Sequence, residues 1–288
     1  LFDDAPLPVR QLKGSERTPR LDLSNKKLGF LSATAIAGLL PTNSALTDLN
    51  LLGNDMGAPG CRAVARAARH SALRGLNLAS NALGHDGTAG PDSAGAAVVL
   101  GGLPPPPRRV VGAGDAEGND QLFADMMAAV GQLSSLERLA LDNNELSHGE
   151  LLAPVGRMGN LQRLNLAHNK LISLPESIGQ LRALTDLSVQ NNALIELPAS
   201  LGRLCALERL SAQNNCLVFL PESFAQLNEL KTASLSDNRL QRLPPSIAAG
   251  CCALEKLEVA HNPLQKPPIT VVRQGVTAVR RFFQDLAR

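Results

Sequence analysis

Leucines recur along most of the chain in one fixed pattern, L-x-x-L-x-L-x-x-N-x-L, where x is any residue. Its clear copies begin at Leu46, Leu73, Leu136, Leu161, Leu184, Leu207, Leu230 and Leu254. Apolar and polar positions alternate at the centre of each copy, as in Leu161-Gln-Arg-Leu164-Asn-Leu166, which indicates a short β-strand with one buried face. A weaker first copy starts at Thr18 and has Lys26 at the Asn position. The pattern predicts parallel strands stacked over one continuous leucine core.

The asparagine of the pattern is the polar residue that this core needs. It occurs at Asn54, Asn81, Asn144, Asn169, Asn192, Asn215, Asn238 and Asn262. Backbone groups are exposed where the chain leaves each strand, and a buried side-chain amide can satisfy them. We therefore expect the asparagines to turn inward and form a hydrogen-bonded ladder.

The segments between the strands shorten along the chain. The early copies are 28 and 27 residues apart, and the segments 31–40 and 60–70 have helical patterns, the second preceded by Pro59. From Leu161 the spacing falls to 23, then 24, and each link contains Leu-Pro-x-Ser-hydrophobic, as in Leu174-Pro175-Glu176-Ser177-Ile178. So few residues predict one short 3₁₀ turn per repeat.

Residues 84–135 form an irregular insert, because two repeats begin 63 residues apart at Leu73 and Leu136. We expect one helix from Asp92 to Leu103, then a degenerate strand at 109–113 that keeps the stack continuous. The glycines up to Gly118 are interpreted as a flexible loop. A second helix with a buried face follows, formed by Leu122, Phe123, Met126, Met127, Val130 and Leu133. The count is nine readable repeats and one eroded repeat.

Both ends differ from the repeats. Residues 1–17 are interpreted as an N-terminal extension, 18–269 as the repeat domain and 270–288 as a capping helix. The apolar face of that helix consists of Val276, Val279, Phe282, Phe283 and Leu286, and it would cover the leucines of the last repeat. Arg280 and Arg281 lie off this face, so we expect their replacement to leave the fold intact. Binding of an acidic partner through these arginines is the alternative role.

The repeats resemble those of intracellular leucine-rich repeat proteins. The front, with Asn54-Asp-Met-Gly57 and Asn81-Ala-Leu-Gly84, is similar to the ribonuclease-inhibitor type. The back, with its Leu-Pro steps, resembles the Ras-suppressor-like type with 23-residue repeats, as does the ending Asn262-Pro-Leu-Gln-Lys-Pro-Pro268. This resemblance implies an α/β leucine-rich repeat solenoid: a curved parallel sheet on the concave side, and helices followed by 3₁₀ turns on the convex side. Such repeats serve many functions, so it does not imply one.

Composition excludes several classes of protein. The net charge is +2, which gives no overall basic field for nucleic acid or membranes, and no stretch is long and apolar enough for membrane insertion. The five cysteines lie at repeat positions and do not cluster in modules flanking the array, and no N-x-Ser/Thr acceptor occurs. A reducing, cytoplasmic location is therefore expected, with the cytoskeleton or a cilium as candidate sites.

The sequence contains no convergent acids, bases or nucleophiles. Its five histidines are scattered; His168 and His261 share a turn position, where solvated turn residues are the simplest interpretation. The adjacent Cys251 and Cys252 have neither the zinc nor the redox spacing, and core filling explains them. We expect no enzyme activity, no cofactor, no metal ion and no small-molecule substrate.

Binding is the remaining function, and the outward positions of the strands are its candidate site. Arg138, Arg163 and Arg209 share one column, interrupted by Asp186. No aromatic residue lies on this face, so arginine is its only typical binding hot spot. The alternative is that these are ordinary solvated strand residues. The candidate protein-binding residues are Arg138, Asp142, Arg163, Asn165, Asp186, Gln190, Arg209 and Gln213. An acidic or polar protein surface is the expected partner; a larger apolar contact would use the ends or the convex side.

A second candidate site is the segment Pro104-Pro-Pro-Pro107-Arg108-Arg109, which fits P-x-x-P-x-R. That pattern is typical of polyproline II ligands of SH3-type domains, with Pro104, Pro107 and Arg109 as the contacts. The alternative is a loop breaker after a helix.

These features together predict a non-catalytic protein–protein interaction scaffold, a subunit of a larger intracellular assembly such as a cytoskeletal or ciliary one. The alternative, suggested by the Leu-Pro repeats, is a regulatory adaptor in small-GTPase or kinase signalling.

Overall fold

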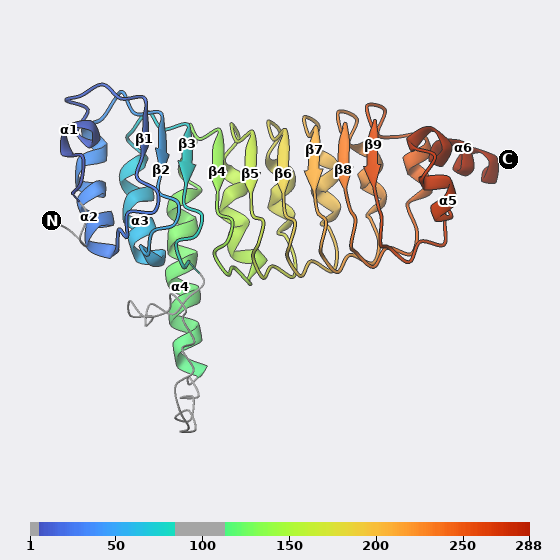
Figure 1. Ribbon diagram of the computed structural model, residues 1–288, viewed down its shortest axis with the longest axis horizontal. Coiled ribbons are helices and arrows are strands. Elements are labelled where there is room, and N and C mark those ends of the chain that lie inside the picture. Colours follow the sequence, from blue (N-terminus) through green and yellow to red (C-terminus); the bar gives the residue numbers. More distant parts are fainter. Residues whose placement is uncertain (1–5, 84–112) are drawn as a thin grey trace, which may run out of the picture.

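Nine short parallel strands form a single open sheet in chain order. The computed structural model describes residues 6–83 and 113–288, and every strand pairs with its neighbour in the sequence. The strands are β1 Arg20–Asp22, β2 Asp48–Asn50, β3 Gly75–Asn77, β4 Arg138–Ala140, β5 Arg163–Asn165, β6 Asp186–Ser188, β7 Arg209–Ser211, β8 Thr232–Ser234 and β9 Lys256–Glu258. The sheet covers one side of an elongated solenoid, and the helices cover the other (Figure 1). The predicted fold class is confirmed.

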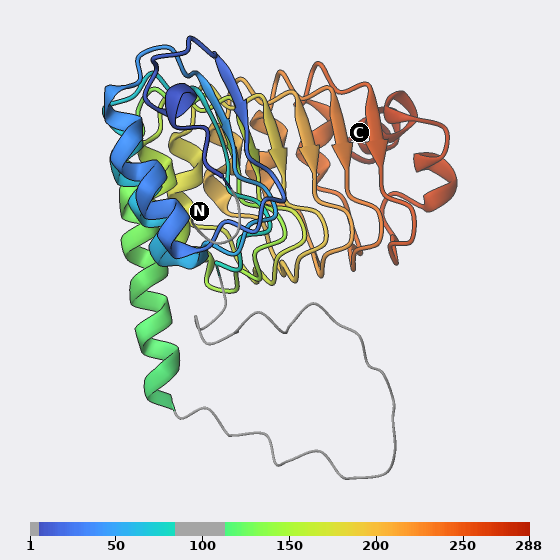
Figure 2. The same cartoon turned by 60° about the vertical axis from the view of Figure 1, so that its left-hand side comes forward.

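The convex side changes from α-helices to 3₁₀ turns along the chain (Figure 2). The α-helices of the front are α2 Phe30–Leu39, which continues into η1 Leu40–Thr42, α3 Gly57–Ala68 and α4 Ala113–Val130. The 3₁₀ segments are η2 Gly149–Arg157, η3 Glu176–Gln180, η4 Ala199–Arg203, η5 Glu222–Gln226 and η6 Pro245–Ala248. The last four begin directly at or after the proline of the Leu-Pro step. This confirms the expected single turn per short repeat.

One apolar core runs through the whole stack. The central leucine of each strand, such as Leu187 at 1% exposure, packs between its equivalents Leu164 and Leu210 in the neighbouring strands. Ala233 replaces this leucine in β8 and is fully buried as well. The predicted frame of inward and outward positions is therefore confirmed for the strands.

The ladder of asparagines is also confirmed. In Asn192 the amide nitrogen donates to the carbonyls of Leu166 and Val189, each at 3.0 Å. The amide oxygen accepts from the backbone N–H of Leu171 at 3.0 Å. Each asparagine thus joins its own repeat to the preceding one. The ladder crosses the insert without a break, because the N–H of Asn81 donates to Oδ1 of Asn144 at 2.8 Å.

The insert differs from its prediction in two respects. β3 pairs directly with β4, with Gly75 opposite Arg138, so the strand expected at 109–113 does not lie between them. Among the described residues the sheet has nine strands. The residues 113–118, expected as a glycine-rich loop, belong to α4 because this helix begins at Ala113. The buried face predicted for α4 is confirmed at Phe123, Met126, Met127, Val130 and Leu133, whereas Leu122 is half-buried. The helix expected at 92–103 lies outside the described residues.

Both ends of the stack are covered. Within the expected extension, α1 Val9–Leu12 buries Leu12 completely, and the amide of Asn43 donates to the carbonyl of Gln11 at 2.7 Å. At the other end, α5 Ile269–Val272 and α6 Val276–Leu286 pack over the last repeat, with Val276, Val279 and Phe283 buried. Phe282 packs edge-on against Phe283, and Leu286 is exposed.

Arg280 makes a contact that helical spacing does not predict. Its guanidinium donates to the backbone carbonyl of Cys251 at 2.6 Å and to that of Cys252 at 3.3 Å. That its replacement leaves the fold intact stays a prediction, made without these two hydrogen bonds. Arg281 is exposed and pairs only loosely with Asp285, at 3.9 Å.

Candidate functional site

The outward residues of the strands form the concave face, and its first column carries most of the charge. We call this the arginine column; it consists of the first residue of each strand, Arg20, Asp48, Gly75, Arg138, Arg163, Asp186, Arg209, Thr232 and Lys256. The register confirms that Arg138, Arg163, Asp186 and Arg209 follow one another across four neighbouring strands. The sequence also placed Asp48 in this column but gave it no role.

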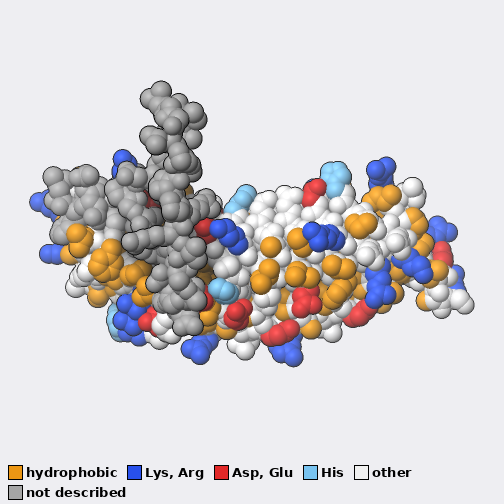
Figure 3. All heavy atoms as spheres, turned by 90° about the horizontal axis from the view of Figure 1, so that it is seen from below, with side chains coloured by type: hydrophobic (Ala, Val, Ile, Leu, Met, Phe, Trp, Pro, Cys, Tyr) orange, Lys and Arg blue, Asp and Glu red, His pale blue; other side chains and the backbone are white. Residues whose placement is uncertain are grey.

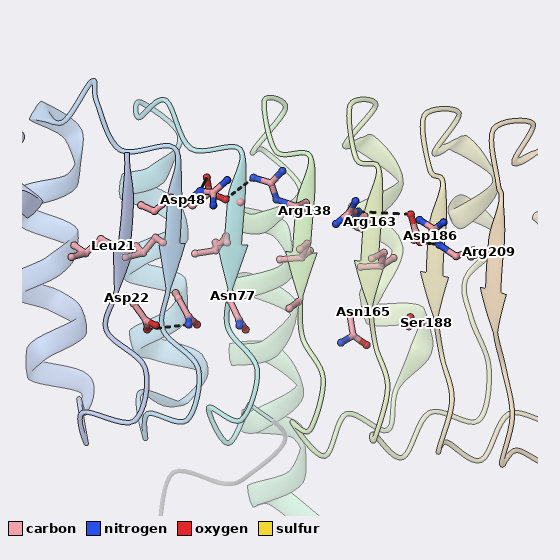
Figure 4. Close-up of a pocket in the computed structure, with 18 residues that line it drawn as sticks. Leu21, Asp22, Asp48, Asn77, Arg138, Arg163, Asn165, Asp186, Ser188 and Arg209 are labelled. Carbon is pink, nitrogen blue, oxygen red and sulfur yellow. Dashed lines mark hydrogen bonds and ion pairs between the residues drawn. The ribbon is translucent and has the colours of Figure 1, made fainter. Parts of the chain in front are cut away.

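The charges of this column are arranged as two Arg–Asp–Arg triads. In the first triad, Asp48 lies 3.8 Å from Nε of Arg20 and 2.5 Å from Nη2 of Arg138. In the second, Asp186 lies 3.8 Å from Nε of Arg163 and accepts a hydrogen bond from Nε of Arg209. Figure 4 shows Asp48 turned toward Arg138, and Asp186 turned toward Arg163 and Arg209. Each aspartate holds two arginines over the concave face.

Both aspartates are supported by the same local sequence. Asp48 and Asp186 each end the tetrapeptide Ala-Leu-Thr-Asp, which begins at Ala45 and at Ala183. The threonine hydroxyl lies 3.0 Å from Asp48 Oδ2 in the first triad and 2.8 Å from Asp186 Oδ2 in the second. This repeated tetrapeptide is the signal in the sequence that indicates that the two aspartates have the same role in their triads.

Gly75 lets the first triad span an extra strand. It lies between Asp48 and Arg138 in the column, and a Cβ at this position would lie 2.3 Å from Oδ1 of Asp48 and 3.2 Å from Nη2 of Arg138. Any other residue here would force these side chains to move. The absence of a side chain therefore leaves the space that the Arg138–Asp48 contact occupies.

The second triad shifts the ionisation of its members. Partial burial opposes ionisation of Asp186, but hydrogen bonds from Arg209 and Thr185 and the charges of Arg209 and Arg163 lower its pKa below the ordinary value. The hydrogen bond to Asp186 in turn raises the pKa of Arg209. Asp186 is therefore a carboxylate, and Arg209 beside it a cation, at neutral pH.

Asp142 and Asn165 form a separate contact on this face. The amide of Asn165 donates to Oδ1 of Asp142 at 2.8 Å, and its oxygen accepts from the N–H of Ala167 at 3.1 Å. Burial raises the pKa of Asp142, while a backbone hydrogen bond and the charge of His168 lower it less. These two predicted residues interact with each other and not with the arginine column.

Gln190 and Gln213 lie beyond the ends of β6 and β7. The side-chain oxygen of each is buried and has no hydrogen-bond partner among the described residues. Neither glutamine lines the hollow that the triads surround. The predicted residues Pro104, Pro107 and Arg109 lie outside the described residues.

A hollow of about 670 Å³ lies on the concave face between β1 and β7. Both triads line it, together with polar residues of the second column such as Asn50, Asn77, Asn165 and Ser188. In the described parts of the chain, no group of three or more histidine, cysteine or acidic side chains is placed to hold a metal ion. No described helix is both long and apolar enough to cross a membrane. What the hollow offers is guanidinium and amide hydrogen-bond donors held at fixed positions.

A second surface follows the loops after the strands. Ile172, Ile195 and Phe219 are 53%, 53% and 45% exposed and occur in consecutive repeats. Seen from this edge, hydrophobic side chains alternate with acidic and basic ones along the back half of the solenoid (Figure 3). This surface therefore exposes large apolar side chains at three consecutive repeats.

Comparison with known proteins defines the class. The family model of a leucine-rich repeat region matches residues 121–266, about half of the chain, and the chain belongs to the leucine-rich repeat proteins. This fold commonly mediates protein–protein interaction. No curated protein matches the chain.

Solved structures share the fold. The chain is 27% identical to a leucine-rich repeat protein of Leptospira interrogans, with a TM-score of 0.58, over 91% of this chain and 60% of that one. A plant peptide hormone receptor, RGFR1 in complex with RGF2, is 23% identical with a TM-score of 0.56, over 85% and 32%. The TLR13–ssRNA13 complex is 22% identical with a TM-score of 0.60, over 90% and 31%. The chain thus spans three fifths of the Leptospira protein and about a third of each receptor.

Proposed function

We propose that this protein is a non-catalytic scaffold that binds a protein partner on its concave face, as a subunit of a larger assembly. The observation that carries the proposal is the pair of Arg–Asp–Arg triads. Holding long side chains in one geometry lowers the entropy lost when a partner binds. Arginine is also the residue most enriched in binding hot spots after the aromatic ones, and the chain contains no Trp or Tyr. A partner with an acidic or polar surface matches these cations.

The finer assignments belong to this proposal. The α-helical front repeats favour the ribonuclease-inhibitor type, and the 3₁₀ repeats of the back favour the Ras-suppressor-like type. All five cysteines are free thiols, which supports a reducing, cytoplasmic location. A cytoskeletal or ciliary assembly is the proposed setting. The competing assignment is a regulatory adaptor for a small GTPase or a kinase.

Affinity capture from the native source tests the proposal. The bait is the full chain, compared with a variant in which Arg138, Arg163 and Arg209 are changed to Glu, and with the control Arg157→Glu. Arg157 is exposed at the end of η2 on the convex side. We expect the wild type and the control to retain a protein that the triple variant loses.

The proteins retained separate the two assignments. Structural proteins of the cytoskeleton or cilium support the scaffold, whereas a GTPase or kinase that depends on the same arginines supports the adaptor. Equal capture by all three baits would overturn binding through the concave face. Folding of the triple variant is checked by circular dichroism, because like charges replace the ion pairs.

A further inference from the structure

The two triads meet at β4 and β5, and this junction brings two arginines together. Arg138 and Arg163 are direct partners in the register, so their backbones are about 4.8 Å apart, as in any sheet. Every other neighbouring pair in the arginine column combines opposite charges or includes an uncharged residue. Like charges directly opposite on neighbouring strands destabilise a sheet. The junction is thus the one position in the arginine column where two like charges are neighbours in the register.

The aspartates do not neutralise this junction. Each triad has two guanidinium groups and one carboxylate, which leaves a charge of +1 per triad. Asp48 draws Arg138 toward β2, and Asp186 draws Arg163 toward β6. The other acidic group near the junction, Glu137, lies 3.9 Å from Arg138 but pairs more closely with Arg74, at 2.9 Å. The acidic groups therefore offset only part of the positive charge at the junction.

Both guanidinium groups keep hydrogen-bond donors for a ligand. A guanidinium has five N–H groups in a planar fork, and the described contacts use few of those on Arg138 and Arg163. Their side chains are 40% and 64% exposed, so solvent reaches them. Below them in the second column stand the small Ala140 and Asn165, whose amide is already bound to Asp142. Most donors of the two guanidiniums are therefore not used by the described contacts.

We propose that the slot between Arg138 and Arg163 binds the carboxylate of an Asp or Glu side chain in an extended segment of the protein partner. One carboxylate accepts hydrogen bonds from both guanidiniums, and such charge-assisted bonds are about twice as strong as neutral ones. It also removes the repulsion between the two arginines. This inference rests on the proposed function and specifies which feature of the partner the concave face recognises.

The same surface disfavours a nucleic acid. A single strand carries one phosphate per nucleotide, whereas the column alternates cations with Asp48 and Asp186, and Asp22 and Asp142 stand in the columns beside it. Proteins that bind single strands also stack bases on aromatic side chains, and the outward strand positions contain none. Isolated carboxylates match the alternation better than a continuous row of phosphates.

Titration of the full chain with two matched peptides tests the slot. The probe is acetyl-Ser-Glu-Ser-Glu-Ser-Glu-Ser-amide, in which the glutamates share one side of an extended strand; the control peptide has Gln at each Glu. The readout is the proton–nitrogen NMR signal of each arginine Nε–H. We expect the signals of Arg138 and Arg163 to move with the Glu peptide only, while that of Arg157 stays in place.

Three variants sharpen the test. Arg163→Gln should weaken binding of the Glu peptide about tenfold, which corresponds to one charge-assisted hydrogen bond. Arg163→Lys keeps the charge but loses the planar guanidinium, so its affinity for the Glu peptide should lie between that of Arg163→Gln and that of the wild type. Arg157→Gln should bind as the wild type does. Equal movement of all arginine signals, no movement, or tighter binding of a uridine oligonucleotide to the same arginines would overturn the inference.

The two proposals fail in different ways. If the triple variant loses its native partner but the Glu peptide does not move Arg138 and Arg163, the scaffold function stands and the slot is wrong. If the Glu peptide titrates the slot but capture is independent of the concave face, the slot is right and the proposed function is wrong.

Discussion

At the scale of single residues, the asparagine ladder shows how one side chain satisfies two repeats. Asn192 binds the carbonyls of Leu166 and Val189 and the N–H of Leu171. Replacing Asn192 by Ala leaves the N–H of Leu171 without its partner, while the carbonyls of Leu166 and Val189 keep hydrogen bonds from Asn169 and Asn215. We expect a loss of about 1–3 kcal/mol in the free energy of unfolding, measured by urea denaturation. Ser188→Ala, at an outward strand position nearby, is the control, and equal midpoints for the two variants would contradict this role of the ladder.

Asp142 provides a pH-dependent prediction at the same scale. Burial raises its pKa above the unfolded value of about 3.9, so the folded state binds the proton more tightly than the unfolded chain. Stability from this group is present at low pH and is lost as the pH rises through the folded pKa. Asp142→Asn keeps an acceptor for Asn165 without the charge. The variant should therefore melt at a higher temperature than the wild type near pH 7 and equally near about pH 3.5. A difference independent of pH would contradict this prediction.

Sequence reasoning located part of the site and missed its organisation. The outward column containing Arg163, Asp186 and Arg209 follows from the period of two and the repeat spacing. The Arg138–Asp48 contact does not, because the two residues are 90 positions apart and both β3 and the insert lie between them in the sequence. The contact also depends on the absence of a side chain at Gly75. The sequence shows this glycine, but it does not show that Gly75 lies beside Asp48 and Arg138.

At the scale of elements, the terminal helix α6 is held to the last repeat by an apolar face and by the hydrogen bonds of Arg280. Arg280 donates to the carbonyl of Cys251 at 2.6 Å, whereas Arg281 is directed to solvent with its side chain 84% exposed. Arg280→Ser should cost about 1–3 kcal/mol in the free energy of unfolding, since it removes a hydrogen bond from a charged donor, although the carbonyl of Cys251 keeps the N–H of Leu254 as a partner. Arg281→Ser should stay within about 0.5 kcal/mol of the wild type. Chemical denaturation measures the free energy of unfolding of both variants. Equal losses would show that the hydrogen bonds of Arg280 do not contribute to stability.

Removal of the whole helix is a stronger test of capping. Deleting residues 276–288 removes Val279 and Phe283 from the core and uncovers the last repeat, including Leu254. An apolar end with an unpaired edge strand at β9 is a route to aggregation. We expect the truncated chain to form soluble oligomers or precipitate, measured by light scattering after size-exclusion chromatography. A stable monomer would mean that α6 is not required as a cap.

Element types were predictable wherever a pattern repeats. The strands, the helices of the front and the 3₁₀ turns of the back all follow from the periods of their leucines and prolines. The start of α4 was missed because Gly114 and Gly118 favour a loop locally, whereas the structure extends the helix to Ala113. The buried residues from Phe123 onward anchor that helix against η2 and α3.

At the scale of the whole molecule, stability depends on contact between neighbouring repeats. Leu187 is 1% exposed and lies between Leu164 and Leu210 in the middle of the sheet. Leu187→Asp would bury a carboxylate with no partner, which costs several kcal/mol. Hydrogen exchange should increase on both sides of β6 while α2 and α3 stay protected. A melting temperature within about two degrees of the wild type would contradict the assigned frame.

The asparagine ladder makes the repeats of the back half interchangeable units. Each asparagine uses the same donors and acceptors toward the repeat before it, and the repeats from Leu161 to Leu230 are 23 residues long. Duplication or loss of one such repeat in the gene would therefore bring together repeats that form the same ladder hydrogen bonds with each other. A unit gained after β7 would lengthen the concave face and leave both triads in place. A unit gained between β4 and β5 would separate Arg138 from Arg163, so evolutionary change in length is compatible with this site outside β1 to β7 and not at β4 and β5.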